Sequence, residues 1–130
     1  MATFTLRVRP GTGVDISDPN ANPKEVPGAT FGFVDRLLED THGHLRGTLT
    51  FRGMVTKKFA VDDLEVAFDA TNKLDEGVIN TQGVIRFNDL GSANGVTFAI
   101  VGGTGRYKKA RGTVTAKLVN SVPQFTFKVR

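Results

Sequence analysis

The feature that most constrains the fold is a pair of alternating apolar segments, residues 96–101 and 113–119, connected through the glycine-rich stretch 102–105. In both segments apolar residues recur at every second position, which is the pattern of a β-strand with one buried face. Three glycines within four residues permit positive φ angles or a close approach of two backbones, as a corner between strands requires. Gly112 provides a second such position just before the next segment. The region predicts two neighbouring strands with a tight corner between them.

The same alternation continues through most of the chain. The expected strands cover residues 3–9, 29–38, 45–55, 59–70 with a break at 62–63, 78–88, 96–101, 113–119 and 124–130. Short turns join most of them, and no segment has a convincing helical period. The sequence therefore predicts one all-β domain over residues 1–130, an antiparallel meander that closes into a barrel of about eight strands. The first strand, TFTLRVR, and the last, QFTFKVR, share one pattern and are expected to pair and close the sheet.

One long connection interrupts this pattern. Residues 10–28 contain four of the five prolines together with Gly, Asp and Asn. A loop of this length is usually functional or disordered. We expect a loop here, which in a barrel can lie across the mouth as a lid.

Several function classes find no support in the sequence. The glycine-rich stretch lacks the spacing of a P-loop or a dinucleotide fingerprint. The basic cluster Arg106, Lys108, Lys109 and Arg111 has no aromatic stacking platform, so we expect no nucleic-acid partner. His42 and His44 have no carboxylate at ligand spacing, and we expect no metal.

There is no cysteine and no apolar run near the roughly 20 residues of a membrane helix, and we expect no membrane association. The N-terminal MATFTLRVRP lacks the apolar core of a signal peptide, which favours the cytoplasm.

The interior of the predicted barrel is rich in phenylalanine. Strand alternation assigns to one apolar face the residues Phe4, Leu6, Val8, Phe31, Phe33, Leu49, Phe51, Phe98, Phe125 and Phe127. A barrel of about eight strands is just wide enough for packed side chains or one small ligand. Composition alone favours a solid, phenylalanine-packed core.

The segment GGTGRYKKARGTV, residues 102–114, resembles the signature of the dirigent proteins and the allene-oxide-cyclase-like barrels. Two other segments, FVDRLLEDTHGHLRGTLTFRG and LDEGVINTQGVIRFND, are similar to regions of the same family, closer to its bacterial members. The resemblance implies an eight-stranded barrel that encloses a pocket for an apolar substrate and needs no cofactor. The acidic residue in the first strand of plant dirigent proteins has no counterpart in residues 3–9. The glutamate and asparagine of plant allene oxide cyclases have no assigned position here.

Two residues are candidates for chemistry inside the barrel. Asp35 shares the register of Phe31, Phe33 and Leu37, and a buried carboxylate is costly unless it is paired or protonated. Its alternative role is structural, satisfying backbone groups of the long loop or pairing with Arg111. Tyr107, the only tyrosine, is expected at a barrel mouth, as a catalytic residue or as a plug.

The sequence thus leads to two hypotheses. The first is a cofactor-independent cyclase or isomerase that holds a reactive polyene, epoxide or polyketide-like molecule against Phe31, Phe33, Phe51, Phe98, Phe125 and Phe127 and controls its ring closure. The second is a non-catalytic small-molecule binding protein or dirigent-like template. In both, the partner is an apolar small molecule, and the protein is a monomer or a small homo-oligomer.

Overall fold

The chain forms a closed barrel in a computed structural model that describes residues 2–15, 26–39 and 43–130. Each strand pairs antiparallel with its neighbours in the sequence, and β8 pairs with β1. The elements are β1 Ala2–Asp15, β2 Thr30–Glu39, β3 Leu45–Ala60, β4 Asp63–Leu74, β5 Gly77–Arg86, the 3₁₀-helix η1 Phe87–Gly91, β6 Val96–Gly103, the 3₁₀-helix η2 Gly105–Tyr107, β7 Gly112–Val119 and β8 Val122–Val129. The described residues contain no α-helix. The predicted closed antiparallel barrel of eight strands is confirmed.

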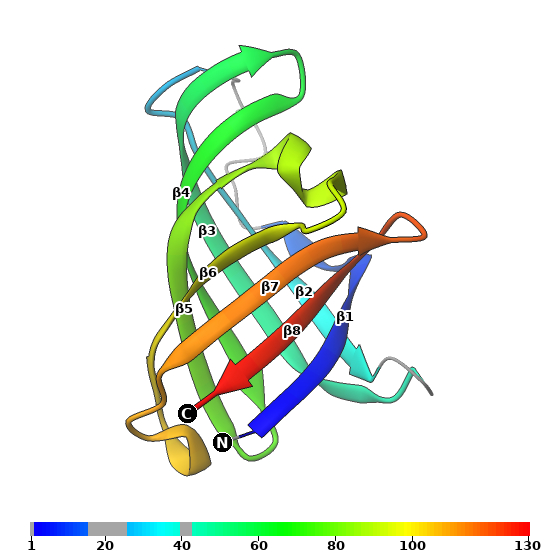
Figure 1. Ribbon diagram of the computed structural model, residues 1–130, viewed down its shortest axis with the longest axis vertical. Coiled ribbons are helices and arrows are strands. Elements are labelled where there is room, and N and C mark those ends of the chain that lie inside the picture. Colours follow the sequence, from blue (N-terminus) through cyan, green and yellow to red (C-terminus); the bar gives the residue numbers. More distant parts are fainter. Residues whose placement is uncertain (1, 16–25, 40–42) are drawn as a thin grey trace.

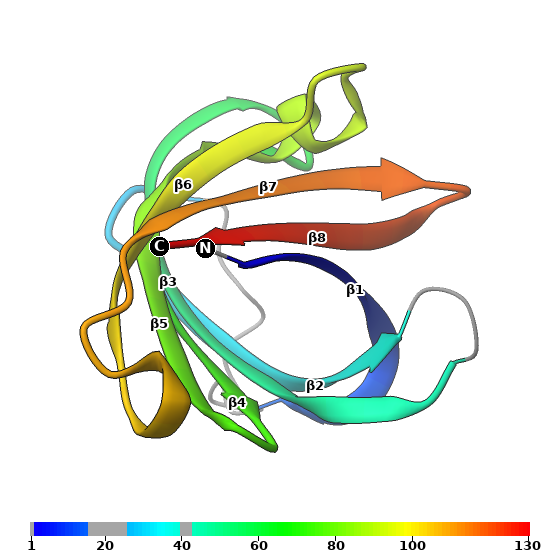
Figure 2. The same cartoon turned by 60° about the horizontal axis from the view of Figure 1, so that its bottom comes forward.

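The two ends of the barrel differ. Figure 1 shows η1 and the β3–β4 hairpin at one end, and η2, the β4–β5 hairpin and the two chain termini at the other. We call these the η1 end and the η2 end. Figure 2 views the molecule with the η2 end brought forward, where β1 and β8 lie side by side. In this pairing Phe4 is opposite Phe127 and Leu6 is opposite Phe125, so the expected closure by the first and last strands is confirmed.

Several element boundaries differ from the sequence prediction. The strand predicted over 78–88 ends at Arg86, because residues 87–88 belong to η1. Strand β1 continues to Asp15, so the predicted loop 10–28 is wrong in its first part, and residues 16–25 of it lie outside the described residues. Residues 59–60 belong to β3 rather than to the strand after it, because the chain reverses at Asp62, which has a φ of +61°. Strand β4 continues beyond the predicted end at residue 70, so Asn72 is part of the strand and not of the turn that we expected to follow it. Alternation marks strand faces well but marks strand ends poorly.

The glycine-rich corner has the geometry that its composition predicts. Thr104 and Val78 exchange backbone hydrogen bonds of 2.9 and 3.3 Å, and the Arg106 amide donates to the Glu76 carbonyl at 2.9 Å. These bonds tie η2 to the β4–β5 hairpin. A Cβ at Gly103 would collide with the Val78 carbonyl oxygen. At Gly112 the φ is +138°, and a Cβ would collide with the Lys128 carbonyl oxygen. Close backbone approach therefore explains Gly103, and both approach and φ explain Gly112.

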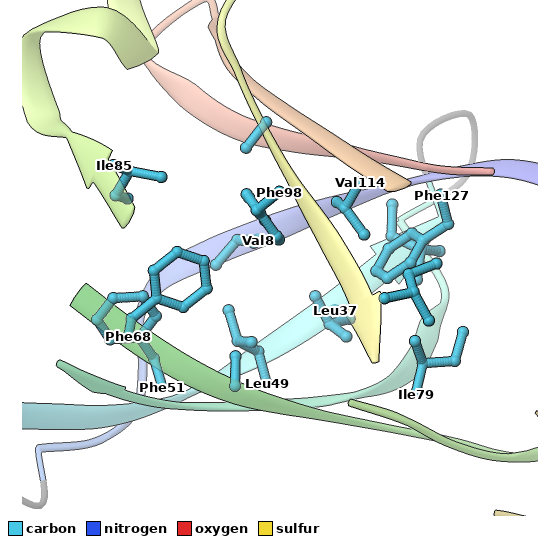
Figure 3. Close-up of a cluster of buried hydrophobic side chains, with 14 of the residues drawn as sticks. Val8, Leu37, Leu49, Phe51, Phe68, Ile79, Ile85, Phe98, Val114 and Phe127 are labelled. Carbon is cyan, nitrogen blue, oxygen red and sulfur yellow. The ribbon is translucent and has the colours of Figure 1, made fainter. Parts of the chain in front are cut away.

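Buried apolar side chains pack the barrel interior toward the η2 end, and we call this part the solid half. The side chains of Leu6, Leu37, Ile79, Ile100, Val114 and Phe127 are at most 2% exposed there. In Figure 3 the labelled Leu37, Ile79, Val114 and Phe127 converge from β2, β5, β7 and β8. Phe4 lies over this group, with its ring stacked on that of Phe127 at a centroid distance of 4.9 Å.

A charged clamp holds the η1 end together. Arg86, the last residue of β5, donates from Nε to Oδ1 of Asp63 at 3.0 Å and from Nη2 to Oδ2 at 2.6 Å. The Phe59 ring of β3 lies 3.8 Å from the Arg86 guanidinium carbon, a cation–π contact. The clamp joins β3, β4 and β5 directly before η1. The hydrogen bonds from Arg86 hold the pKa of Asp63 below its ordinary value.

We expect the clamp to make stability depend on pH. Because the pKa of Asp63 is lower in the folded than in the unfolded chain, its contribution is present above the ordinary carboxyl pKa and is lost as the pH falls through the folded value. Asp63→Asn should therefore lower the melting temperature at pH 7, and the difference from the parent should shrink toward pH 2. Asp69→Asn breaks the exposed Arg52 pair, whose side chains are 70% and 59% exposed, and should change the melting temperature little. Parallel curves for Asp63→Asn and the parent from pH 7 to 2 would contradict this account.

Candidate functional site

A cavity of about 210 Å³ occupies the barrel interior toward the η1 end. Its lining residues come from all strands of the barrel and from η1. They are Val8, Phe33, Asp35, Leu49, Phe51, Phe68, Ala70, Thr81, Ile85, Phe87, Leu90, Phe98, Ala116, Pro123 and Phe125. All of these are apolar except Asp35 and Thr81. The interior is thus packed at the η2 end and hollow at the η1 end. The sequence analysis predicted either a pocket or a solid core for the whole interior, and did not predict that both occur in one barrel.

Phenylalanine rings form a continuous wall of the cavity. Phe33, Phe51 and Phe68 stack in sequence at centroid distances of 5.0 and 5.1 Å, with interplanar angles of 10° and 18°. Phe98 then meets Phe68 edge-on at 4.9 Å and Phe125 at 6.0 Å. Figure 3 shows Phe51 and Phe68 projecting toward the side of the barrel that carries Phe98 and Val8. Rings that pack against one another in this way hold a fixed shape.

The six phenylalanines predicted to bind substrate divide into two groups. Phe33, Phe51, Phe98 and Phe125 line the cavity. Phe31 does not line it and instead contacts Phe51 and Phe87 at centroid distances of 5.7 and 6.3 Å. Phe127 is fully buried in the solid part of the core. Alternation assigns all six to the same face, but it carries no information about height along the barrel axis.

Asp35 is placed in the cavity wall by the register of β2. It lies opposite Leu49 of β3, which also lines the cavity, and two residues from Phe33. Its carboxyl group is therefore one of two polar groups in an apolar lining. Such a group can hydrogen-bond a ligand or exchange a proton with it.

Tyr107 lies at the other end of the barrel. Its side chain is 8% exposed in η2, and its ring centroid is 6.4 Å from that of Phe4. Burial raises the pKa of Tyr107, and the neighbouring Glu76 carboxylate raises it further. The phenol does not line the cavity. The structure therefore does not bring the two candidate residues Asp35 and Tyr107 together at the cavity, and Tyr107 is buried in η2 at the other end.

Two buried polar residues were missed by the sequence reasoning. Thr81 is 2% exposed and lines the cavity, and Asn72 is 1% exposed on the inward face of β4. The signal for both was available, because Thr81 shares the period of Ile79 and Ile85, and Asn72 shares that of Phe68, Ala70 and Leu74. The same argument that selected Asp35 selects these two residues.

Within residues 2–15, 26–39 and 43–130, no group of three or more His, Cys, Asp or Glu side chains is arranged to hold a metal ion. In that same part of the chain, no helix has the length and apolarity needed to cross a membrane.

Comparison with known proteins identifies the family. The sequence model described as "Allene oxide cyclase barrel like domain" matches residues 21–129. The chain belongs to this family. The family resemblance seen in the glycine-rich corner is thereby confirmed for the allene-oxide-cyclase-like barrels. A search of curated proteins finds no significant match.

Several solved structures share this allene-oxide-cyclase-like barrel. A pyocyanin demethylase is 24% identical with a TM-score of 0.75, covering 99% of this chain and 100% of its own. AbnU, named as an exo-specific intermolecular Diels–Alderase, is 17% identical with a TM-score of 0.63, covering 98% and 91%. The Diels–Alderase AbmU from Streptomyces koyangensis is 21% identical with a TM-score of 0.63, covering 99% and 63%. At these identities the comparison establishes the fold, and the reaction has to be argued from the site.

Proposed function

We propose that this protein is a cofactor-independent cyclase or isomerase that binds an apolar, reactive small molecule in the hollow half of the barrel and controls its ring closure. The observation that carries the proposal is a cavity inside the barrel whose described lining is apolar apart from Asp35 and Thr81. Two of the similar structures are named as Diels–Alderases, which form rings, and this supports the proposal. The third is named as a demethylase, so the fold alone does not select the reaction.

Ring closure of a polyene or an epoxide suits such a site. It is an isomerisation, so every atom of the substrate remains in the product and no co-reactant is consumed. The enzyme has to hold the flexible chain in the one conformation whose reacting ends are in contact, and preorganisation of this kind supplies about 7–11 kcal/mol in favourable cases. A wall of mutually packed Phe33, Phe51 and Phe68 rings provides a rigid surface for it. Asp35 lines the same cavity, and in this proposal it lends a proton to a substrate oxygen and takes it back.

A binding protein without catalytic activity is the second candidate. Its support is the position of Tyr107 away from the cavity, because Asp35 is then the one ionisable group among the described residues that line it. A site with a single acidic group can hold and orient a ligand without any proton transfer.

Filling the cavity tests whether ligands bind inside the barrel. Ala116 of β7 lines the cavity and is 1% exposed, whereas Ala99 of β6 is exposed on the outer face. We expect Ala116→Phe to weaken binding of 2-methylnaphthalene at least about tenfold, because the added ring occupies much of the cavity. Ala99→Phe should leave it unchanged. The measurement is titration of the naphthalene fluorescence, with melting curves for both variants. Equal affinity in the two variants would place ligand binding outside the barrel and contradict both functions.

A further inference from the structure

Thr81 lines the cavity, and its buried hydroxyl is an unsatisfied polar group. Thr81 is 2% exposed, and its Oγ1 has no hydrogen-bond partner among the described residues. It pairs with Ala70, which lines the cavity, on one side and with Ile100, which belongs to the solid core, on the other. The hydroxyl thus lies where the hollow half meets the solid half. An isolated buried hydroxyl is costly, and valine would fill the same volume without that cost.

A second unsatisfied oxygen lies on the same face of the β4–β5 pair. Asn72 is the next inward residue along β4 after Ala70, and it is opposite Ile79, the inward neighbour of Thr81. Its Nδ2 donates to the Ile79 carbonyl at 3.1 Å, which fixes the orientation of the amide. Its Oδ1 has no partner among the described residues. Two polar side chains at adjacent inward positions therefore both retain hydrogen-bonding capacity.

We propose that Thr81 determines the specificity of this site by hydrogen-bonding a hydroxyl group of the ligand. The inference rests on the function proposed above and names its ligand class. The ligand is an apolar ring system or folded chain with one hydroxyl, and it enters with the hydroxyl first.

The chemistry of the site favours a donor on the ligand. Of the two polar residues that line the cavity, an ionised Asp35 can only accept, and the Thr81 hydroxyl can donate or accept. A ligand hydroxyl can donate to either residue and can accept from Thr81, whereas an ether or a halogen cannot donate. The size of the ligand follows from the cavity. A dry cavity of about 150 Å³ holds benzene, so about 210 Å³ suits a molecule the size of two fused rings.

A pair of isosteric probes tests the inference. 2-Naphthol and 2-methylnaphthalene differ by a hydroxyl in place of a methyl group, and both fluoresce. We expect Thr81→Val to weaken 2-naphthol binding about 3- to 10-fold, the value of one hydrogen bond, while 2-methylnaphthalene binding stays within twofold or tightens. Thr81→Ser keeps the hydroxyl and should retain the preference of the parent. Thr71→Val, on the exposed face of β4, is the matched control and should change neither affinity.

The outcomes separate this inference from the proposed function. If 2-methylnaphthalene binds and Ala116→Phe blocks it, but Thr81→Val changes both probes equally, the hydroxyl subsite is wrong and the binding cavity stands. If the parent protein binds neither probe, both proposals fail. Melting curves of Thr81→Val accompany the titrations, since a folded variant with selective loss of 2-naphthol binding is the result that supports the subsite.

Discussion

Gly112→Ala is expected to lower the free energy of unfolding by about 2–6 kcal/mol. Two penalties combine at this position. A φ of +138° costs a non-glycine residue about 1–3 kcal/mol, and the backbone shift needed to move a Cβ away from the Lys128 carbonyl costs a similar amount. The shift occurs where β7 pairs with β8, opposite Val129, so it also disturbs the ladder next to the closing strand pair. Chemical denaturation monitored by circular dichroism measures the effect.

Two other glycines separate the causes. Gly28 has a φ of +92° with open space around its Cβ position, so Gly28→Ala should cost about 1–3 kcal/mol from the backbone conformation alone. Gly91 has open space and no positive φ, and Gly91→Ala should leave stability unchanged or slightly raised. If Gly112→Ala is no more destabilising than Gly28→Ala, the collision with Lys128 is relieved without cost and the account of this corner is wrong.

Asp35→Asn is expected to reduce the rate of ring closure about 10²- to 10⁴-fold, if the protein is the proposed cyclase and the carboxyl group acts as its general acid. Asparagine has the size and shape of aspartate, but its amide group cannot give a proton to the substrate as a carboxylic acid can. The binding of 2-methylnaphthalene should remain within about threefold, because the apolar lining is untouched. The measurement is turnover of a panel of conjugated polyenes and epoxides, with the ring-closed isomer detected by chromatography.

The same variant distinguishes the two candidate functions. A binding protein would show no ring closure in the parent, and Asp35→Asn would change ligand affinity less than about tenfold. Where the parent does close the ring, unchanged turnover in Asp35→Asn would remove the carboxyl group from the chemistry and leave catalysis to preorganisation alone. Asp69→Asn, an outward substitution on β4, serves as the control for a general effect of losing one negative charge.

The fold was largely predictable because every strand alternates over enough residues to reveal its buried face. The barrel, its antiparallel order and the closure by residues 3–9 and 124–130 all follow from that signal. Alternation also placed Asp35 inward, where it lines the cavity. The alternation does not show, however, how far along the barrel axis a side chain lies. Phe31 and Phe33 share a face, and only Phe33 reaches the cavity, since two residues along a tilted strand correspond to different levels of the barrel.

The parts that could not be predicted depend on features outside the strand period. Phe87 and Leu90 line the cavity from η1, where the chain has left the β5 register and a period of two no longer applies. Whether the interior is hollow or filled depends on which side chains meet across the barrel, and that is a property of several strands together. The inward position of Thr81 was predictable from the strand period. Threonine is frequent on the exposed faces of these strands, however, and for that reason Thr81 was not selected as a candidate.

The division of the barrel into a solid and a hollow half has a consequence for how sequences of this kind can diverge. Truncating a side chain in close-packed surroundings leaves a new void and costs about 2–5 kcal/mol. Around an existing cavity the same exchange enlarges a space that a ligand can fill, and ligand binding then offsets part of the cost. The cavity wall therefore tolerates more variation than the packed half. Natural selection can then rework the lining of the η1 end for new small molecules while Leu6, Leu37, Ile79 and Phe127 keep the barrel closed. Such a difference between the two halves would allow barrels to keep one fold while their sequences diverge to 17–24% identity.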